Sequence, residues 1–184
     1  MGKKVIFILT IVTLIISCSP KTSMEYYKLA SKQSKKAKTF TNAETNYKKA
    51  IELDSTNSSA YVGLGVLKMN SLNTNELGWA RNYFTKAIVI DSTKADVWYF
   101  LAYTYIRESE IKKDTIDGNK LIIAISYLTK AISLNNKNSI YFYQKGYCYN
   151  YLGDTIKSNE NFKISCNLGN FFACEFLNYH TQKE

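Results

Sequence analysis

Cysteine and histidine are the residue types that would give this 184-residue chain nucleophilic, metal-binding or redox chemistry, and they are few. The cysteines are Cys18, Cys148, Cys166 and Cys174, and the one histidine, His180, lies four residues from the C-terminal end. A single histidine so placed forms no Ser–His, Cys–His or zinc-ligand cluster, and the carboxylates are scattered over helix surfaces and turns. We therefore expect no enzyme activity, no metal and no cofactor.

The first cysteine ends an apolar run that has the features of a targeting segment. Two lysines (residues 3–4) precede residues 5–17, VIFILTIVTLIIS. This run is shorter than the ~20 residues of a transmembrane helix, and it fits the apolar core of a secretory signal peptide. The residues Ile-Ile-Ser before Cys18 resemble the lipobox of bacterial lipoproteins, with isoleucine where leucine is usual.

In that family the cysteine is lipid-modified and becomes the first residue of the mature protein. The resemblance therefore implies a signal peptide over residues 1–17, lipid on Cys18 and a short tether over residues 18–23. Loss of two lysines would reduce the formal charge from +9 to +7. We expect the mature chain in the bacterial cell envelope, anchored to the outer membrane on its periplasmic side. An uncleaved anchor or an ordinary signal peptide is the alternative.

The rest of the chain contains a similar helix four times. Pairs of small residues are spaced by seven, which is two helical turns, so both lie on a face that a neighbouring helix can approach closely. These pairs are Ala43/Ala50, Ala80/Ala87, Ala124/Ala131 and Ser158/Ser165. A helix of this kind cannot bury that face alone, so it stacks with its copies. A partner helix before each copy carries an aromatic residue and, four positions later, a small one: Tyr27/Ser31, Tyr61/Gly65, Trp98/Ala102 and Phe142/Gly146.

These helix pairs resemble the tetratricopeptide repeat (TPR), a helix–turn–helix unit of about 34 residues. The resemblance implies an all-α, right-handed α-solenoid of about four TPR-like repeats in one domain over residues 24–184. The repeats are 24–57, 58–94, 95–138 and 139–172, with a capping helix at 173–182. Two repeats are longer between their helices; the longer insertion contributes to residues 108–120, where we expect a solvated loop. Ser55, Ser92 and Asn136 replace the family's proline, and we expect them to cap the next helix.

The segment from Cys166 to Cys174 resembles the cysteine-rich Sel1-like relatives of this repeat, in which two cysteines with seven residues between them bridge adjacent helices. The resemblance implies a Cys166–Cys174 disulfide, since an exported protein meets an oxidising compartment. Two buried thiols are the alternative. Cys148 lies between two tyrosines within a helix, where we expect it to be buried.

In the TPR family the first helix of each repeat lines a concave surface. The corresponding positions here run from a lysine-rich end to a tyrosine-rich end: Lys28, Lys32, Lys35, Lys36; Val62, Val66, Met69, Asn70; Tyr99, Tyr103, Ile106, Arg107; Tyr143, Tyr147, Asn150, Tyr151. Tyrosine and arginine suit recognition because they bury large areas and keep a polar tip. We expect a partner-binding groove of Tyr99, Tyr103, Arg107, Tyr143, Tyr147 and Tyr151, the alternative being that several tyrosines only pack between helices.

The resemblance implies a membrane-anchored scaffold that binds a protein or peptide in the envelope, in assembly or secretion machinery. A glycan- or peptidoglycan-binding module is the alternative, because sugar rings stack on tyrosine faces. Export separates the basic chain from nucleic acid, so we expect no nucleic acid as partner. We also expect no small-molecule substrate, since none is evident from the residues. Basic charge also favours anionic membrane surfaces.

Overall fold

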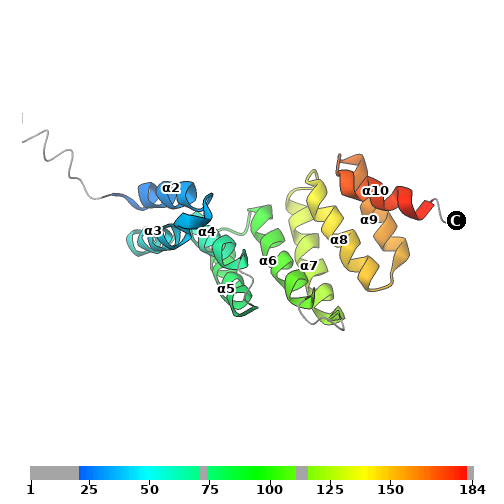
Figure 1. The fold of residues 1–184 in the computed structure, drawn as a ribbon, viewed down its shortest axis with the longest axis horizontal. Coiled ribbons are helices and arrows are strands. Elements are labelled where there is room, and N and C mark those ends of the chain that lie inside the picture. Colours follow the sequence, from blue (N-terminus) through cyan, green and yellow to red (C-terminus); the bar gives the residue numbers. More distant parts are fainter. Residues whose placement is uncertain (1–20, 71–73, 111–115, 182–184) are drawn as a thin grey trace, which may run out of the picture.

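The structure is a computed structural model that describes residues 21–70, 74–110 and 116–181. All regular secondary structure in these ranges is helical, and the helices follow one another along one long axis, from α2 to α10 (Figure 1). Their bounds are α2 Ser23–Gln33, η1 Ala37–Thr39, α3 Phe40–Leu53, α4 Ser58–Met69, α5 Thr74–Ile90, α6 Ala95–Glu110, α7 Gly118–Leu134, α8 Ser139–Tyr151, α9 Thr155–Asn167 and α10 Phe171–Thr181. The expected signal peptide and Cys18 lie outside the described residues. None of the described helices is both long and apolar enough to cross a bilayer.

The helices form pairs of a first and a second helix. The first helices α2, α4, α6 and α8 pack on the second helices α3, α5, α7 and α9, and α10 packs on α9. Successive first helices also contact one another, α2 with α4, α4 with α6 and α6 with α8, so they form the inner row of the stack. This arrangement confirms the expected all-α solenoid of TPR-like helix pairs.

The small-residue pairs lie where the sequence pattern places them. Every alanine of the three alanine pairs is 0% exposed, and Ser158 and Ser165 are at most 1% exposed. Large residues of the second helices fill the space that the small residues of the first helices leave. A Cβ on Gly65 would lie 2.4 Å from the ring of Phe84, and one on Gly146 would lie 3.1 Å from Phe162. Close approach of the two helices therefore depends on the small side chains.

The turns between repeats are made by side chains that the sequence pattern did not single out. The carboxylate of Asp54 accepts a hydrogen bond from the backbone N–H of Thr56 at 2.9 Å, and Asp91 and Asn135 accept in the same way two residues along. Asn57 caps α4 and Asn138 caps α8, so the prediction that Ser55 and Asn136 cap these helices is wrong. Ser92 contributes its carbonyl, which accepts from Trp98 Nε1 at 2.9 Å. Asparagine and aspartate occupy these positions because their side chains close turns and cap helices.

The longer insertion extends helices as well as adding a connection. Helix α6 continues to Glu110, and α7 begins at Gly118 after the cap Asp117, whose carboxylate accepts from the N–H of Asn119 at 3.1 Å. Glu108 lies 2.6 Å from Arg81 and 3.4 Å from Lys120. The prediction of a solvated loop over 108–120 is therefore wrong at both ends, because ion pairs and a cap favour helix there.

The last two helices are joined covalently. Cys166 near the end of α9 forms a disulfide with Cys174 of α10, and their Cα atoms are 4.8 Å apart. Gly169, with φ of 89°, makes the turn between these helices. Cys148 on α8 is a buried free thiol, and burial raises the pKa of that thiol to about 12.

Candidate partner-binding groove

The six expected groove residues lie on two neighbouring helices of the inner row. Tyr99, Tyr103 and Arg107 follow one another at intervals of four on α6, and Tyr143, Tyr147 and Tyr151 do so on α8. This spacing keeps each set on one side of its helix. Because α6 and α8 contact each other, the two sets belong to adjacent parts of the same surface.

Tyr99 packs between α6 and α8 and exposes little of its ring to solvent. Its ring lies 5.3 Å from the ring of Tyr141 on α8 and 6.0 Å from that of Tyr103. Burial raises the pKa of Tyr99 to about 12. The hydroxyl of Tyr141 donates a hydrogen bond to Asp96, which fixes the start of α6 against α8. Tyr103, beside this cluster, stays half-buried.

At the far end of α6 a second pair of tyrosines is arranged differently. The hydroxyl of Tyr147 donates to the carboxylate of Glu110 at 2.6 Å, and burial together with this hydrogen bond raises the pKa of Tyr147. The ring of Tyr151 lies 4.6 Å from that of Tyr147 and is 46% exposed. Tyr147 is thus held in place, while Tyr151 offers its ring to solvent.

Tyr143 belongs to a different neighbourhood. Its ring lies 5.6 Å from Phe162 of α9 and 6.4 Å from Phe172 of α10. Phe171 and Phe172 are each 65% exposed. The structure therefore does not join Tyr143 to the α6 tyrosines, and it adds two exposed phenylalanines that the repeat pattern did not mark, because they begin the capping helix rather than a repeat.

Two positions assigned to the concave surface are buried instead. Met69 and Ile106 are 7% and 1% exposed and lie in the same buried clusters as Leu77 and Leu121. The corresponding residue in the repeat without an insertion, Asn150, is exposed. The second helices of these two repeats, α5 and α7, are seventeen residues long each. The lysines assigned to α2 and its C-terminal end are all exposed.

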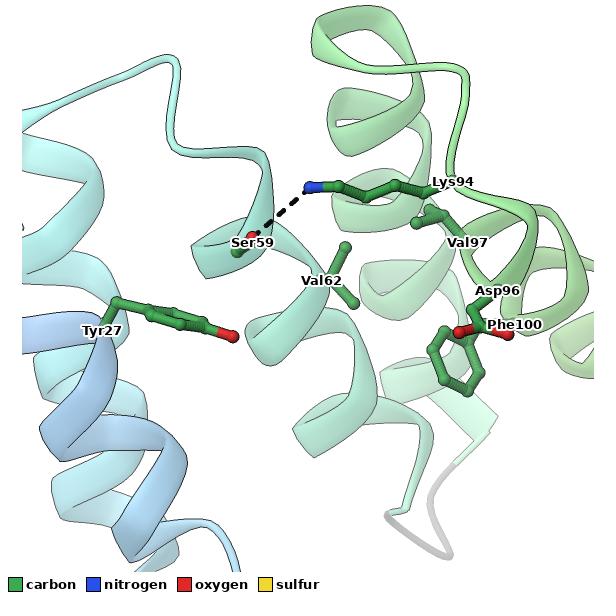
Figure 2. Close-up of a pocket in the computed structure, with 7 residues that line it drawn as sticks. All are labelled: Tyr27, Ser59, Val62, Lys94, Asp96, Val97 and Phe100. Atoms are coloured by element: carbon green, nitrogen blue, oxygen red, sulfur yellow. Dashed lines mark hydrogen bonds between the residues drawn. The ribbon is translucent and has the colours of Figure 1, made fainter. Parts of the chain in front are cut away.

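A hollow of about 190 Å³ lies further along the inner row, between α2, α4 and α6 (Figure 2). Tyr27 of α2 and Phe100 of α6 face it from opposite sides, with Val62 of α4 between them (Figure 2). Its full lining is Tyr27, Ser59, Val62, Lys94, Asp96, Val97 and Phe100. The inner row thus combines apolar walls with one cation and one carboxylate.

Lys94 enters this hollow because of a substitution in the repeat. It occupies the place that Asn57 and Asn138 hold before the other first helices. Instead of capping α6 with a side-chain amide, its ammonium lies 3.4 Å from Ser59 Oγ and 3.4 Å from the carboxylate of Asp91. Alignment of the three turns would have revealed this change from the sequence.

The exposed groups of the inner row are of types that can bind a partner. Among the described residues no group of three or more histidines, cysteines or carboxylates is placed to hold a metal ion. The exposed groups are tyrosine rings, the Arg107 guanidinium, the Lys94 ammonium and the Asp96 carboxylate. Such groups bury area and donate or accept hydrogen bonds with a partner.

No protein-family model and no curated protein matches this sequence. Solved structures do resemble it. MamA is 25% identical, with a TM-score of 0.59 over 72% of this chain and 70% of MamA. The thermophilic TPR protein TTC0263 from Thermus thermophilus is 17% identical, with a TM-score of 0.66 over 80% and 75% of the two chains. The first TPR of Spaghetti (RPAP3), bound to an HSP90 peptide, is 18% identical, with a TM-score of 0.57 over 71% and 97%. Over its described residues this chain therefore has the fold of a TPR-like α-solenoid.

Proposed function

We propose that this chain is a lipid-anchored scaffold of the bacterial cell envelope that binds another protein on the inner row of its solenoid. The lipobox-like residues before Cys18 support the anchor, and a scaffold fits a fold in which repeated helices form an extended surface. The structure of RPAP3 holds a peptide, so a solenoid of this fold provides a surface for a protein segment. A location in the cell envelope favours a component of an assembly or secretion machinery as the partner.

The observation that carries the proposal is the set of ordered aromatic groups on α6 and α8. Tyr147 is held by Glu110, and it in turn supports the exposed ring of Tyr151. Arg107 lies on the same side of α6 as Tyr103, and its side chain is part-exposed. Groups that are already fixed lose little conformational entropy when a partner covers them. Tyrosine and arginine in such positions are the residue types that contribute most to binding energy.

Partner capture by two matched double variants tests this assignment. Arg107→Ala/Tyr151→Ala removes one cation and one exposed ring from the inner row, whereas Ile122→Ala/Lys130→Ala removes one exposed apolar group and one cation from the second helix α7. Truncating a residue that dominates an interface costs about 2 kcal/mol or more, or roughly thirtyfold in affinity. We expect that loss for the α6/α8 pair alone, measured with the protein purified from detergent-solubilised envelope. Equal capture by both variants would reject the inner row as the binding surface.

The choice of these residues follows from the packing. Tyr99 and Tyr147 each join α6 to α8, so their replacement by alanine would disturb the solenoid together with any binding surface. Of the residues in the expected groove, Arg107 and Tyr151 are those whose replacement by alanine should change the stability of the solenoid least. Circular dichroism at 222 nm should be the same for both double variants.

The lipid anchor has its own test. Mass spectrometry of the N-terminal peptide from the membrane-extracted protein should show acyl chains on Cys18 at the new N-terminus. Cys18→Ser should leave the chain uncleaved and unlipidated. An intact signal segment, or a cleaved and unmodified Cys18, would remove the anchor from the proposal without affecting the binding surface.

The exposed phenylalanines of α10 favour a second candidate, an envelope glycan. The rings of Phe171 and Phe172 lie 5.9 Å apart, and each is 65% exposed beside Tyr143. Sugar rings stack on such aromatic faces. Co-sedimentation with purified peptidoglycan that is lost in Phe171→Ala/Phe172→Ala would support a glycan module. If the chain does not sediment with peptidoglycan, or if this variant sediments equally well, the glycan candidate is rejected and a protein remains the proposed partner.

A further inference from the structure

Positive charge is concentrated in the first helix and the turn after it. Residues 21–38 contain six lysines and one glutamate, a net charge of +5. Residues 39–181 contain fifteen basic and thirteen acidic residues, a net charge of only +2. One tenth of the chain thus accounts for most of the +7 expected after removal of a signal peptide. The excess positive charge of the mature chain therefore belongs mainly to the region around α2.

Five of these lysines are exposed, and we call this set the lysine stripe. It consists of Lys21, Lys28, Lys32, Lys35 and Lys36, and all five are exposed. Lys28 and Lys32, four residues apart, lie on one face of α2, whereas Lys21 precedes this helix and Lys35 and Lys36 lie in the turn that follows it. Met24 lies in the same face and is 52% exposed. The stripe therefore combines cations with one exposed apolar side chain.

Little within the described part of the chain offsets the charge of the stripe. No ion pair among those residues involves any of its lysines. The one acidic residue of α2, Glu25, is engaged elsewhere, because its carboxylate accepts a hydrogen bond from the backbone N–H of Thr22 at 2.8 Å in the capping box. That contact and, to a smaller extent, the charges of Lys21 and Lys28 lower the pKa of Glu25. The stripe is therefore free to attract an external anion.

The surroundings of the stripe indicate which anion. Helix α2 lies at one end of the stack (Figure 1). Four residue steps separate Cys18 from Thr22, and a chain of that length spans at most ~14 Å. Beside the stripe, Lys21 and Lys49 lie over the ring of Tyr26 at 5.7 and 5.5 Å. Tyrosine with flanking lysines is typical of surfaces at a membrane interface.

We infer that the lysine stripe docks this end of the solenoid on an anionic lipid surface, next to the lipid anchor. The inference rests on the proposed anchor, which holds the stripe within reach of the headgroups. Electrostatic attraction of exposed charges decays over about 10 Å at 0.1 M salt, so the stripe acts only at such short range. Docking through α2 leaves α6 and α8, which lie further along the stack, clear of the bilayer for a partner.

Vesicle binding by the full chain tests the inference. The protein is sedimented with phosphatidylcholine vesicles and with vesicles that also contain phosphatidylglycerol, and the ratio of the two partition constants is measured. The apolar N-terminal segment is common to both measurements, so the ratio isolates the charge. Two variants remove three lysines each: Lys28→Gln/Lys32→Gln/Lys35→Gln from the stripe, and Lys130→Gln/Lys137→Gln/Lys163→Gln from exposed positions elsewhere.

A lysine at an anionic surface changes the partition constant by about fivefold, so three lysines change it by up to roughly a hundredfold. We expect the stripe variant to lose at least about tenfold in the ratio, and the control variant, which has the same net charge, to lose less than about twofold. Raising the salt to 0.5 M should abolish the preference of the unaltered chain for anionic vesicles. Equal losses in both variants, or no preference for anionic vesicles, would overturn the inference.

A second measurement separates this inference from the proposed function. Capture of an envelope protein by the stripe variant should equal that of the control variant. Loss of that capture with unchanged vesicle binding would assign the stripe to an acidic protein partner and overturn the lipid assignment. Loss of capture by the Arg107/Tyr151 variant, by contrast, concerns the groove alone.

Discussion

The contact between α4 and α5 at Gly65 provides a quantitative test of how the helix pairs are packed. A Cβ added at Gly65 would lie 2.4 Å from Phe84 Cε1, whereas ordinary contacts begin near 3.4 Å. Phe84 is 0% exposed, and its ring stacks on Phe100 with centroids 5.6 Å apart. The ring therefore has no space into which it can withdraw by the required ångström. Gly65→Ala must either shift Phe84 or separate the two helices.

Two effects of opposite sign set the magnitude. Replacing glycine by alanine inside a helix stabilises by about 0.8–1 kcal/mol through backbone entropy. Overpacking a filled core costs about 1–3 kcal/mol, and we place this contact at the upper end because the obstacle is a fully buried ring. Gly65→Ala should therefore lower the free energy of unfolding by about 1–2 kcal/mol.

Gly78 provides the matched control, because a Cβ there meets nothing within 4 Å. Gly78→Ala in α5 should raise the free energy of unfolding by about 1 kcal/mol, so the two variants should differ by roughly 2–3 kcal/mol. At about 2–4 °C per kcal/mol for a chain of this size, that is a difference in Tm of roughly 4–12 °C. Thermal and urea unfolding followed by circular dichroism would measure it. Equal stabilisation by both substitutions would refute the close packing at Gly65.

Three further perturbations have clear expected outcomes. Cys166→Ser/Cys174→Ser should lower the free energy of unfolding by ~2.5 kcal/mol from loop-closure entropy, with faster hydrogen exchange in α9 and α10; unchanged exchange there would contradict the role of the disulfide. Burial raises the pKa of Tyr99 from 10.0 to about 12, so the contribution of this side chain to stability is complete below pH 10 and is lost as the pH rises through about 12. From pH 8 upward, the urea midpoint of the unaltered chain should therefore fall more steeply than that of Tyr99→Phe. Identical slopes would count against this burial. Lys145, half-buried on α8 with a pKa lowered by burial, occupies the position of the buried Leu64, so Lys145→Leu should raise the urea midpoint by the equivalent of about 1 kcal/mol; a lower midpoint would show that the lysine stem packs better.

The repeat architecture could be predicted from the sequence because it is encoded in local spacing. Ala43 and Ala50, seven residues apart, reach full burial by the helical period alone. The resemblance of the segment from Cys166 to Cys174 to Sel1-like repeats similarly indicated two helices joined at a short turn. Such features depend on residues within two turns of one another, and the structure shows both.

The inner surface could be predicted only in part, because it depends on neighbouring repeats. Ile106 has the sequence position of a groove residue, yet it lies in one buried cluster with Leu121 of α7. Tyr99 likewise has the spacing of a surface group, but Tyr141 of the next repeat covers it. Asn150, in a repeat without an insertion, remains exposed as the pattern predicts. At this position the apolar residues Met69 and Ile106 are buried and the polar residue Asn150 is exposed.

The caps between repeats were mispredicted for a different reason. Substitution of the family's proline suggested Ser55 as the cap, whereas the turn is closed by Asp54 and the helix is capped by Asn57. Closing the turn and capping the helix are thus done by two side chains rather than by one. Comparing the three turns position by position identifies Lys94 as the exception that lines the hollow beside α6.

The central claim, that a protein partner binds the inner row at α6 and α8, is tested most directly by site-specific photo-crosslinking in the intact envelope. Benzoyl-phenylalanine is introduced at Tyr103 or Tyr151, and at Thr129, which is exposed on the second helix α7. We predict a discrete crosslinked protein from the positions of Tyr103 and Tyr151 and none from Thr129. Crosslinking of the same protein from Thr129 alone, or equally from all three positions, would contradict it.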